Sequence, residues 1–132
     1  GRVTPEWFNW TLGIQAYTFR YLTLCQTLEY CRDLGIGAIE LYPGQKIGGG
    51  LPGVVTHEMD KTTRLEMLGR FAAAHVRPVA YGVVNGRTPA EWRRGFAFAK
   101  AMGISTVVAE PAPDTKGLMD GLCAEFNMNL GI

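Results

Sequence analysis

The sequence predicts an α/β fold built on a parallel sheet. Three observations predict it. Short apolar runs alternate with amphipathic segments of helical length, the apolar runs are continuous as in strands buried on both faces, and capping residues open the amphipathic segments. About four and a half such strand–helix units fit into the 132 residues, so a parallel sheet with helical crossovers is expected.

The first unit begins with the apolar run Leu12–Tyr17. A helix is expected from Thr23, whose hydroxyl can accept from the backbone while Gln26 reaches back in a capping box. The expected helix ends before Gly35, a residue suited to a left-handed terminal turn. Its apolar face is expected to hold Leu24, Leu28, Cys31 and Leu34.

The second unit has a strand at Ala38–Tyr42 and a long loop that runs through Gly53 and His57. A helix is expected to begin near Asp60. Helical spacing gives it an apolar face of Leu65, Leu68, Ala72 and Val76.

The third unit has a strand at Val79–Val84 and the clearest helix start in the chain. Thr88 is a suitable N-cap, Pro89 fits the first helical position, and Glu91 completes a capping box. The fourth strand is expected at Thr106–Ala109. Asp114 is expected to cap the helix that follows it, with Leu118, Leu122 and Phe126 four residues apart, and a fifth strand is expected at Met128–Ile132.

Two architectures fit these units. One is a doubly wound open sheet of the flavodoxin type, and the other is the first half of an eight-stranded barrel. They differ in strand order, because the doubly wound sheet requires the chain to reverse direction after its first βαβ unit. The local pattern leaves this choice open.

Composition excludes several classes of partner. Hydrophobic residues make up 47% of the chain, charged residues 19%, and the net charge is +1 with Lys and Arg scattered along the sequence. We therefore expect neither nucleic acid nor a membrane as a partner. No segment resembles a signal peptide, so a cytoplasmic protein is expected, although the chain starts at Gly1. Cys25 and Cys31, six positions apart on one helix, are about 9 Å apart, too far for a disulfide, so free thiols are expected.

Polar side chains gather at the carboxyl ends of the expected strands. Glu40 and Glu110 end the second and fourth strands, and Gln15, Tyr17 and Tyr81 occupy comparable places on the first and third. Ligands bind at this end of parallel strands in both architectures, and carboxylate, amide and phenol groups suit a polyol. The competing interpretation is that each Glu forms a structural ion pair with a nearby Arg or Lys.

The glycine-rich segment Gly44–Gly50 lacks the Gly-Lys-Ser/Thr ending of a phosphate-binding loop. We expect a flexible lid. From it Gln45 could reach a sugar hydroxyl and Lys46 an anionic substrate.

Four segments in order resemble the sugar phosphate isomerase/epimerase family of the xylose isomerase-like TIM barrel superfamily. They are Leu12–Arg20, Ala38–Gln45, Ala80–Val84, and Ala99–Ile104 leading to Ala109-Glu110-Pro111. The resemblance extends from about Trp10 to Ile132. It favours the barrel, with residues 1–132 as the N-terminal portion of a single barrel domain.

The resemblance implies a small carbohydrate substrate and proton transfer at a carbon next to a carbonyl, assisted by a divalent metal such as Mn, Mg, Co or Zn. It also implies that most metal ligands lie on later strands, beyond this chain. Glu110 is then the candidate metal ligand, and Gln15, Tyr17, Glu40, Gln45 and Tyr81 are candidate substrate contacts. No catalytic acid or base is assigned, and these residues alone are expected to be inactive and to self-associate through exposed strand edges.

Three alternatives remain open. A lyase or dehydratase could use the same barrel, a complete flavodoxin-like binding domain could account for the strand pattern, or the chain could be a noncatalytic remnant. Fold by itself does not decide among them.

Overall fold

The computed structural model describes residues 12–132, so Trp10, where the resemblance begins, lies outside the described residues. The elements, in chain order, are β1 (Gly13–Gln15), a 3-10 helix (Ala16–Phe19), α1 (Leu24–Leu34), β2 (Ala38–Leu41), β3 (Lys46–Gly48), β4 (Leu51–Val54), α2 (Lys61–Ala74), β5 (Arg77–Val84), α3 (Pro89–Ala101), β6 (Thr106–Ala109), a second 3-10 helix (Pro113–Thr115), α4 (Lys116–Phe126) and β7 (Asn129–Gly131).

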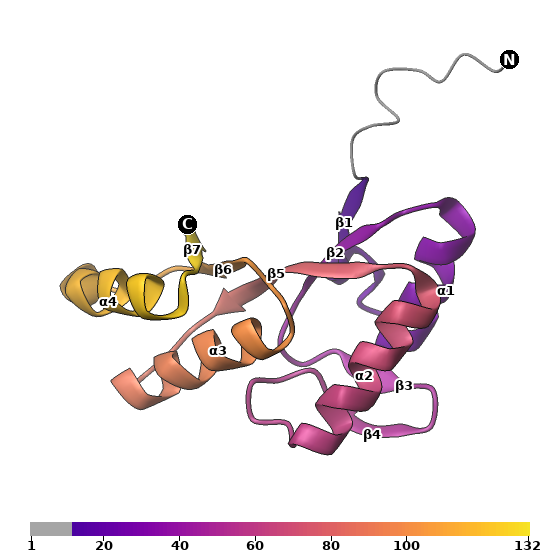
Figure 1. Ribbon diagram of the computed structural model, residues 1–132, viewed down its shortest axis with the longest axis horizontal. Coiled ribbons are helices and arrows are strands. Elements are labelled where there is room, and N and C mark those ends of the chain that lie inside the picture. The colour runs from indigo at the N-terminus through magenta and orange to yellow at the C-terminus, as the bar shows by residue number, and fades with distance from the viewer. Residues whose placement is uncertain (1–11) are drawn as a thin grey trace, which may run out of the picture.

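The main sheet has five strands in the order β1-β2-β5-β6-β7, and every neighbouring pair is parallel. Strands of the main sheet therefore lie side by side in the order in which the chain makes them (Figure 1). A flavodoxin-like sheet would need the order to reverse after the first unit, so that alternative is wrong. Parallel strands in chain order are the arrangement of a (β/α) barrel.

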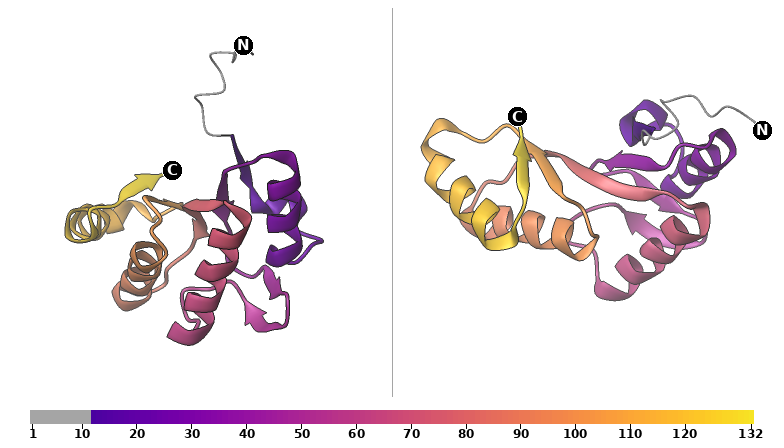
Figure 2. Two further views of the ribbon diagram at one scale, coloured as in Figure 1. Left: turned by 45° about the vertical axis from the view of Figure 1, so that its right-hand side comes forward. Right: turned by 45° about the horizontal axis from the view of Figure 1, so that its top comes forward.

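The four helices lie on one side of this sheet. In Figure 2 (left) α1, α2, α3 and α4 follow one another as an arc around it, with β1 and β7 at opposite edges. No helix of the described residues covers the other side in either view. We call the helix-covered side the outer face and the other side the inner face, which in a closed barrel would be the interior.

Strand register separates the two faces. One row of register partners crosses the sheet as Gln15, Glu40, Ala80, Thr106 and Asn129, and none of the five is fully buried. The adjacent row holds Leu41, Tyr81, Val107 and Leu130. The first three of these are completely buried against the helices. The second row is therefore on the outer face and the first row on the inner face.

Three of the expected helix starts are confirmed. At α2 the Asp60 carboxylate accepts from the backbone N–H of Thr63 at 2.7 Å. At α1 the Thr23 hydroxyl accepts from the backbone N–H of Gln26 at 3.2 Å, and the Gln26 side chain accepts from the Thr23 N–H at 2.9 Å. At α3 Thr88 caps the N–H of Glu91, with Pro89 in the first turn. The Glu91 carboxylate, however, accepts from the N–H of Arg87 instead of that of Thr88.

The expected start of α4 is wrong. Asp114 lies inside the 3-10 helix that Pro113 opens, two positions before α4. It is therefore not the N-cap residue of α4, and its side chain does not cap that helix. The residue before α4 is Thr115, whose hydroxyl donates to the carbonyl of Ala112 at 2.6 Å.

The buried helix faces differ in part from the expected ones. In α2 the buried residues are Met67, Phe71 and Ala74, whereas Leu65 is 55% exposed. In α1 Leu34 is 64% exposed because it is the last helical residue, next to the left-handed Gly35. Both helices bury a continuous stripe at i, i+4 and i+7 spacing. The buried stripe of α1 is the expected one except for Leu34, whereas that of α2 is rotated from the expected face.

The segment Gly44–Gly50, expected to be a flexible lid, contains β3, which pairs with β4 directly after it as an antiparallel hairpin. Gly48, at φ +74°, lies so close to α1 that a Cβ there would be 2.5 Å from the Cβ of Thr23. Only glycine fits this approach. The hairpin is therefore packed against the start of α1.

Cys25, Cys31 and Cys123 are free thiols, as expected. Among residues 12–132, no helix has the length and apolar character needed to cross a membrane.

Candidate functional site

Two of the expected site residues are neighbours at the carboxyl ends of β1 and β2. Gln15 and Glu40 are register partners on the inner face, so their side chains lie together where the strands have their carboxyl ends. Gln15 is exposed and Glu40 is half-buried. Adjacent parallel strands lie about 5 Å apart, so one small ligand can contact both side chains.

A cleft of about 310 Å³ lies at this edge. It is lined by residues that follow or end three adjacent strands, namely Gln15, Tyr17, Tyr42, Pro43, Gly82 and Val83. The rings of Tyr17 and Tyr42 meet edge to face with centroids 5.2 Å apart. Tyr17 comes from the 3-10 helix after β1 and is 52% exposed, so its ring is available to a ligand.

Tyr42 was not among the residues expected at the site. It follows β2 and lies two positions after Glu40, so the alternation of side chains along a strand puts both on the same face. Burial is the main cause of a raised pKa of its phenol, and the neighbouring Tyr17 adds to this while Arg20 opposes it. Its spacing from Glu40 was the signal that could have identified it from the sequence.

Glu40 does not line the cleft itself; it is the register partner of Gln15, which does. Partial burial raises the pKa of its carboxyl above the ordinary value of 4.5. Within residues 12–132 its side chain forms no hydrogen bond or ion pair, so the structural ion pair considered from the sequence is not formed there. A half-buried carboxyl without a fixed cation can exchange a proton more readily than a salt-bridged one.

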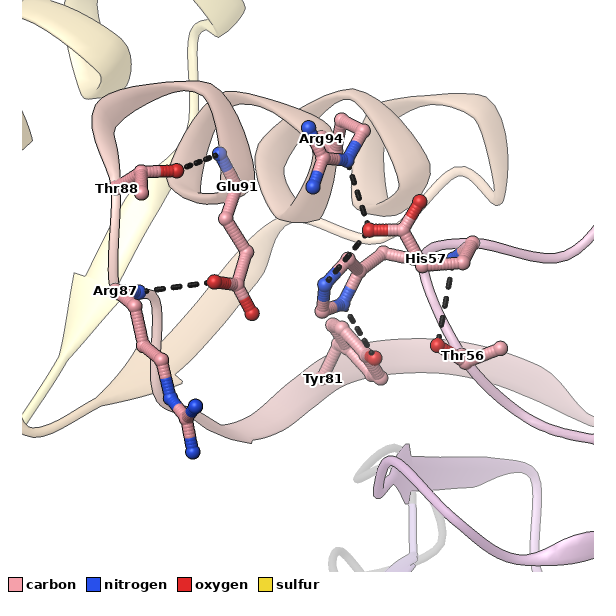
Figure 3. Close-up of polar contacts among 8 residues, drawn as sticks. Thr56, His57, Tyr81, Arg87, Thr88, Glu91 and Arg94 are labelled. Carbon is pink, nitrogen blue, oxygen red and sulfur yellow. Dashed lines mark hydrogen bonds and ion pairs between the residues drawn. The ribbon is translucent and has the colours of Figure 1, made fainter.

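Tyr81 lies on the opposite face from the cleft. Its side chain is completely buried beneath α3, with its ring centroid 4.9 Å from that of Phe98. Its hydroxyl is 3.1 Å from Nδ1 of His57, as Figure 3 shows. Burial raises the pKa of this phenol strongly, so the hydroxyl stays protonated. Tyr81 lies on β5, the strand on which it was expected, but its side chain points toward the helices.

The contact of Tyr81 belongs to a polar chain that links three elements. Nε2 of His57 is 3.7 Å from the Glu58 carboxylate, and the same carboxylate oxygen accepts from Nε of Arg94 in α3 at 2.7 Å. The loop after β4 is thereby tied to both β5 and α3. Sequence spacing gave no signal of this chain, because its contacts to Tyr81 and Arg94 join residues 24 and 36 positions apart.

Gln45 also lies away from the cleft, contrary to its prediction as a substrate contact. Its side chain is 2% exposed, and Nε2 lies 3.3 Å from the carbonyl oxygen of Leu22 and 3.3 Å from Oγ1 of Thr27. Its Oε1 is buried without a hydrogen-bond partner among the described residues. Gln45 does not line the cleft, and it lies in a separate hollow beside it.

Glu110 directly follows β6 and is exposed. Two strand spacings, about 10 Å, separate its strand from that of Glu40, because β5 lies between them. Glu110 is not among the residues that line the cleft. The structure therefore brings together Gln15, Tyr17 and Glu40, and it leaves Gln45, Tyr81 and Glu110 outside that group.

A divalent metal requires more ligands than this group offers. Within the part of the chain that the structure describes, no three His, Cys, Asp or Glu side chains come together. Glu40 and Glu110 could supply two carboxylate side chains, whereas Zn sites use three or four protein ligands and Mg takes six oxygens. The described residues do not by themselves form the metal site that the resemblance implies.

Comparison with known proteins establishes the fold. No family model matches the chain, and no curated protein matches it. An uncharacterised protein from Parabacteroides distasonis superposes with a TM-score of 0.87 at 29% identity, over 92% of this chain and 52% of that one.

Two further solved structures are more distant. A sugar phosphate isomerase/epimerase from Parabacteroides distasonis matches with a TM-score of 0.59 and 10% identity, over 91% of this chain and 49% of its own. A D-psicose 3-epimerase crystallised in the presence of D-fructose matches with 0.60 and 12%, over 91% and 50%. The chain thus spans about half the length of all three proteins. The parallel (β/α) barrel-type fold, incomplete in this chain, is confirmed.

Proposed function

We propose that the protein containing this chain is a sugar isomerase or epimerase that moves a proton at a carbon next to a carbonyl. The observation that carries the proposal is the cleft at the carboxyl ends of β1, β2 and β5, with Glu40 on the inner face beside it. Its fold is also that of two proteins described as a sugar phosphate isomerase/epimerase and a D-psicose 3-epimerase.

The cleft suits a small carbohydrate. The Gln15 amide can donate to one hydroxyl and accept from another, and the Tyr42 phenol offers a further hydrogen bond. Tyr17 and Tyr42 present ring surface to the C–H faces of a sugar. A few polar groups among apolar walls fix the orientation of a bound polyol.

Glu40 is our candidate for the group that carries the proton. Its carboxyl has a raised pKa, lies on the inner face and forms no ion pair with the described residues. A carboxyl with these properties can accept a proton from a carbon acid or return it to a neighbouring carbon. Its position next to Gln15 would place a sugar held by the cleft within reach.

The divalent ion that the resemblance implies belongs to this proposal, with Glu110 as one ligand. When bound, such an ion polarises carbonyl and hydroxyl oxygens and lowers the free energy of an enediolate. Most of its ligands must come from residues other than the described ones, since only Glu40 and Glu110 are available here.

The test uses the entire protein that contains these residues. It is incubated with ketoses and aldoses in D₂O with Mn²⁺ or Mg²⁺ supplied, and NMR follows both deuterium at the carbon next to the carbonyl and the appearance of the isomer. We expect exchange and isomerisation, reduced about 100-fold in Glu40→Gln. Glu29→Gln, an exposed Glu of α1, is the control and should leave both rates unchanged.

Two outcomes would overturn the proposal. Absence of exchange with every sugar would leave a noncatalytic protein. Exchange accompanied by loss of water from the substrate would identify a dehydratase on the same barrel, because the same proton abstraction begins both reactions.

A further inference from the structure

A second hollow adjoins the cleft on the side of α1. Its volume is about 340 Å³, and it is lined by the segment Arg20–Thr23 before α1 and by Tyr42 and residues 44–46 after β2. Tyr42 lines both the cleft and the hollow. A ligand seated in the cleft can therefore extend past Tyr42 into the hollow.

The hollow is positively charged. Arg20 and Lys46 both line it, and no Asp or Glu does. Neither Arg20 nor Lys46 forms an ion pair within the described residues. Two such cations around one hollow attract an anion and lower the free energy of binding it.

Arg20 is held in place by aromatic rings. Its guanidinium carbon is 5.1 Å from the centroid of Tyr17 and 4.8 Å from that of Tyr21. Contacts of this kind orient a guanidinium without consuming its N–H donors. One Nη2 contact to the Tyr21 hydroxyl, at 3.5 Å, is long, so Arg20 keeps donors for a ligand. Tyr17 lines the cleft, and Arg20, which stacks on the Tyr17 ring, lines the hollow, so this pair connects the cleft with the hollow.

Gln45, which lines the same hollow, carries a buried acceptor. Oε1 of Gln45 has no hydrogen-bond partner among the described residues, although the side chain is 2% exposed and its Nε2 is engaged with the start of α1. A buried carbonyl oxygen without a donor destabilises the folded state unless a ligand or water supplies one. The two cations that line the hollow match an anionic group, and Gln45 lies beside them with this acceptor unsatisfied.

We propose that this hollow binds the anionic group, a phosphate ester or a carboxylate, of an acidic sugar whose carbon chain lies in the adjoining cleft. The α1 N-terminus begins at the hollow and adds a favourable dipole. The identity of the ligand as a sugar rests on the proposed function, whereas anion binding is measured without turnover.

The experiment is isothermal titration of the entire protein with D-fructose 6-phosphate, D-gluconate, D-fructose and inorganic phosphate. We expect at least one of the two acidic sugars to bind about tenfold more tightly than D-fructose, with affinity falling between 0.1 and 0.5 M NaCl as charge screening predicts (about 10 Å to below 5 Å screening length). The tighter of the two acidic sugars identifies the anionic group.

Lys46→Gln is the main variant, because Lys46 is exposed and its removal should not disturb folding. It should weaken binding of the acidic sugar about five- to tenfold and leave D-fructose unchanged, with Arg20→Gln as a second variant. Lys61→Gln removes an equal charge at the exposed first residue of α2, away from the hollow, and serves as the control.

Equal binding of neutral and acidic sugars, no binding of any probe, or equal effects of Lys46→Gln and Lys61→Gln would overturn the inference. Turnover separates it from the proposed function. Isomerisation of a neutral sugar that Lys46→Gln leaves intact would sustain the function without the anion site. Tight, Lys46-dependent binding of an acidic sugar without proton exchange would sustain the anion site and refute the isomerase.

Discussion

The two faces of the five-stranded sheet are built from the same strands and differ in almost every respect. On the outer face Leu41, Tyr81 and Val107 are register neighbours with no exposed surface. One position earlier on each strand, the inner face carries Glu40, Ala80 and Thr106, which are at least partly accessible. Stability is thus concentrated on one face and chemistry on the other.

This difference teaches that the end of a strand does not by itself identify a site residue. Glu40 and Tyr81 both lie near the carboxyl ends of their strands, yet one faces the cleft side and the other the helices. Because side chains alternate along a strand, moving one position changes the role from ligand contact to core packing.

The largest expected effect concerns assembly of the 132 residues when they are expressed alone. An uncovered inner face and the unpaired edges of β1 and β7 should bring copies together at micromolar concentration. Val108→Glu adds a charge to the inner face and should shift the sedimentation profile toward monomer. Lys100→Glu, on exposed α3 surface, is the control. A monomeric starting chain would show that the inner face is already protected from contact.

A pair of valines on β6 tests the difference in stability directly. Val107 is completely buried on the outer face, and Val108 is half-buried on the inner face. Val107→Ala should lower the free energy of unfolding by about 2 kcal/mol, since each deleted methyl contributes about 1 kcal/mol. Val108→Ala should lower it by less than about 1 kcal/mol. Urea unfolding measures both, and equal losses would contradict the division into two faces.

Tyr81→Phe sharpens the comparison at a single polar atom. Removing the hydroxyl leaves Nδ1 of His57 without its partner beneath α3, and the expected destabilisation is about 1–2 kcal/mol. Tyr42→Phe should change stability much less, because its hydroxyl forms no hydrogen bond among the described residues, and should instead weaken sugar binding. The idea fails if Tyr42→Phe is the more destabilising of the two in thermal unfolding.

The smallest expected effect is a pH dependence at Glu40. Its folded-state pKa is raised above 4.5, so the ionised carboxylate disfavours the folded state at neutral pH. Glu40→Gln should therefore be slightly more stable than the wild type above the raised pKa. The gap should close as pH falls through that pKa and below 4.5. Unfolding curves at several pH values measure this gap, and a wild type that is the more stable at neutral pH would contradict it.

Local signals made most of the fold predictable from sequence. The capping contacts of Thr23 with Gln26 and of Thr88 with Glu91 involve residues three positions apart, so the sequence contains both partners. Apolar runs located the five strands of the main sheet, since strands whose two faces are both buried in a closed barrel carry continuous apolar runs. Strand order was not local information, and only the tertiary arrangement excluded the doubly wound sheet.

The site was less predictable, because it depends on strand face and on long-range packing. Tyr81 satisfied every local criterion and still points outward, and β5 has a register irregularity between Tyr81 and Val84. Gln45 looked like a lid residue because glycines surround it. Those glycines instead let the hairpin approach Thr23 and bury the amide. Tyr42 was overlooked although its spacing from Glu40 was available.

The agreement between strand order and chain order also has a consequence for biosynthesis. Each strand of the main sheet pairs with the one made before it, so β2, β5, β6 and β7 can each dock on a surface that has already emerged from the ribosome. No strand has to wait for a partner from much later in the chain, which shortens the loops that must close during folding. The sheet can therefore grow from its β1 edge as translation advances, with each new strand added at the opposite edge.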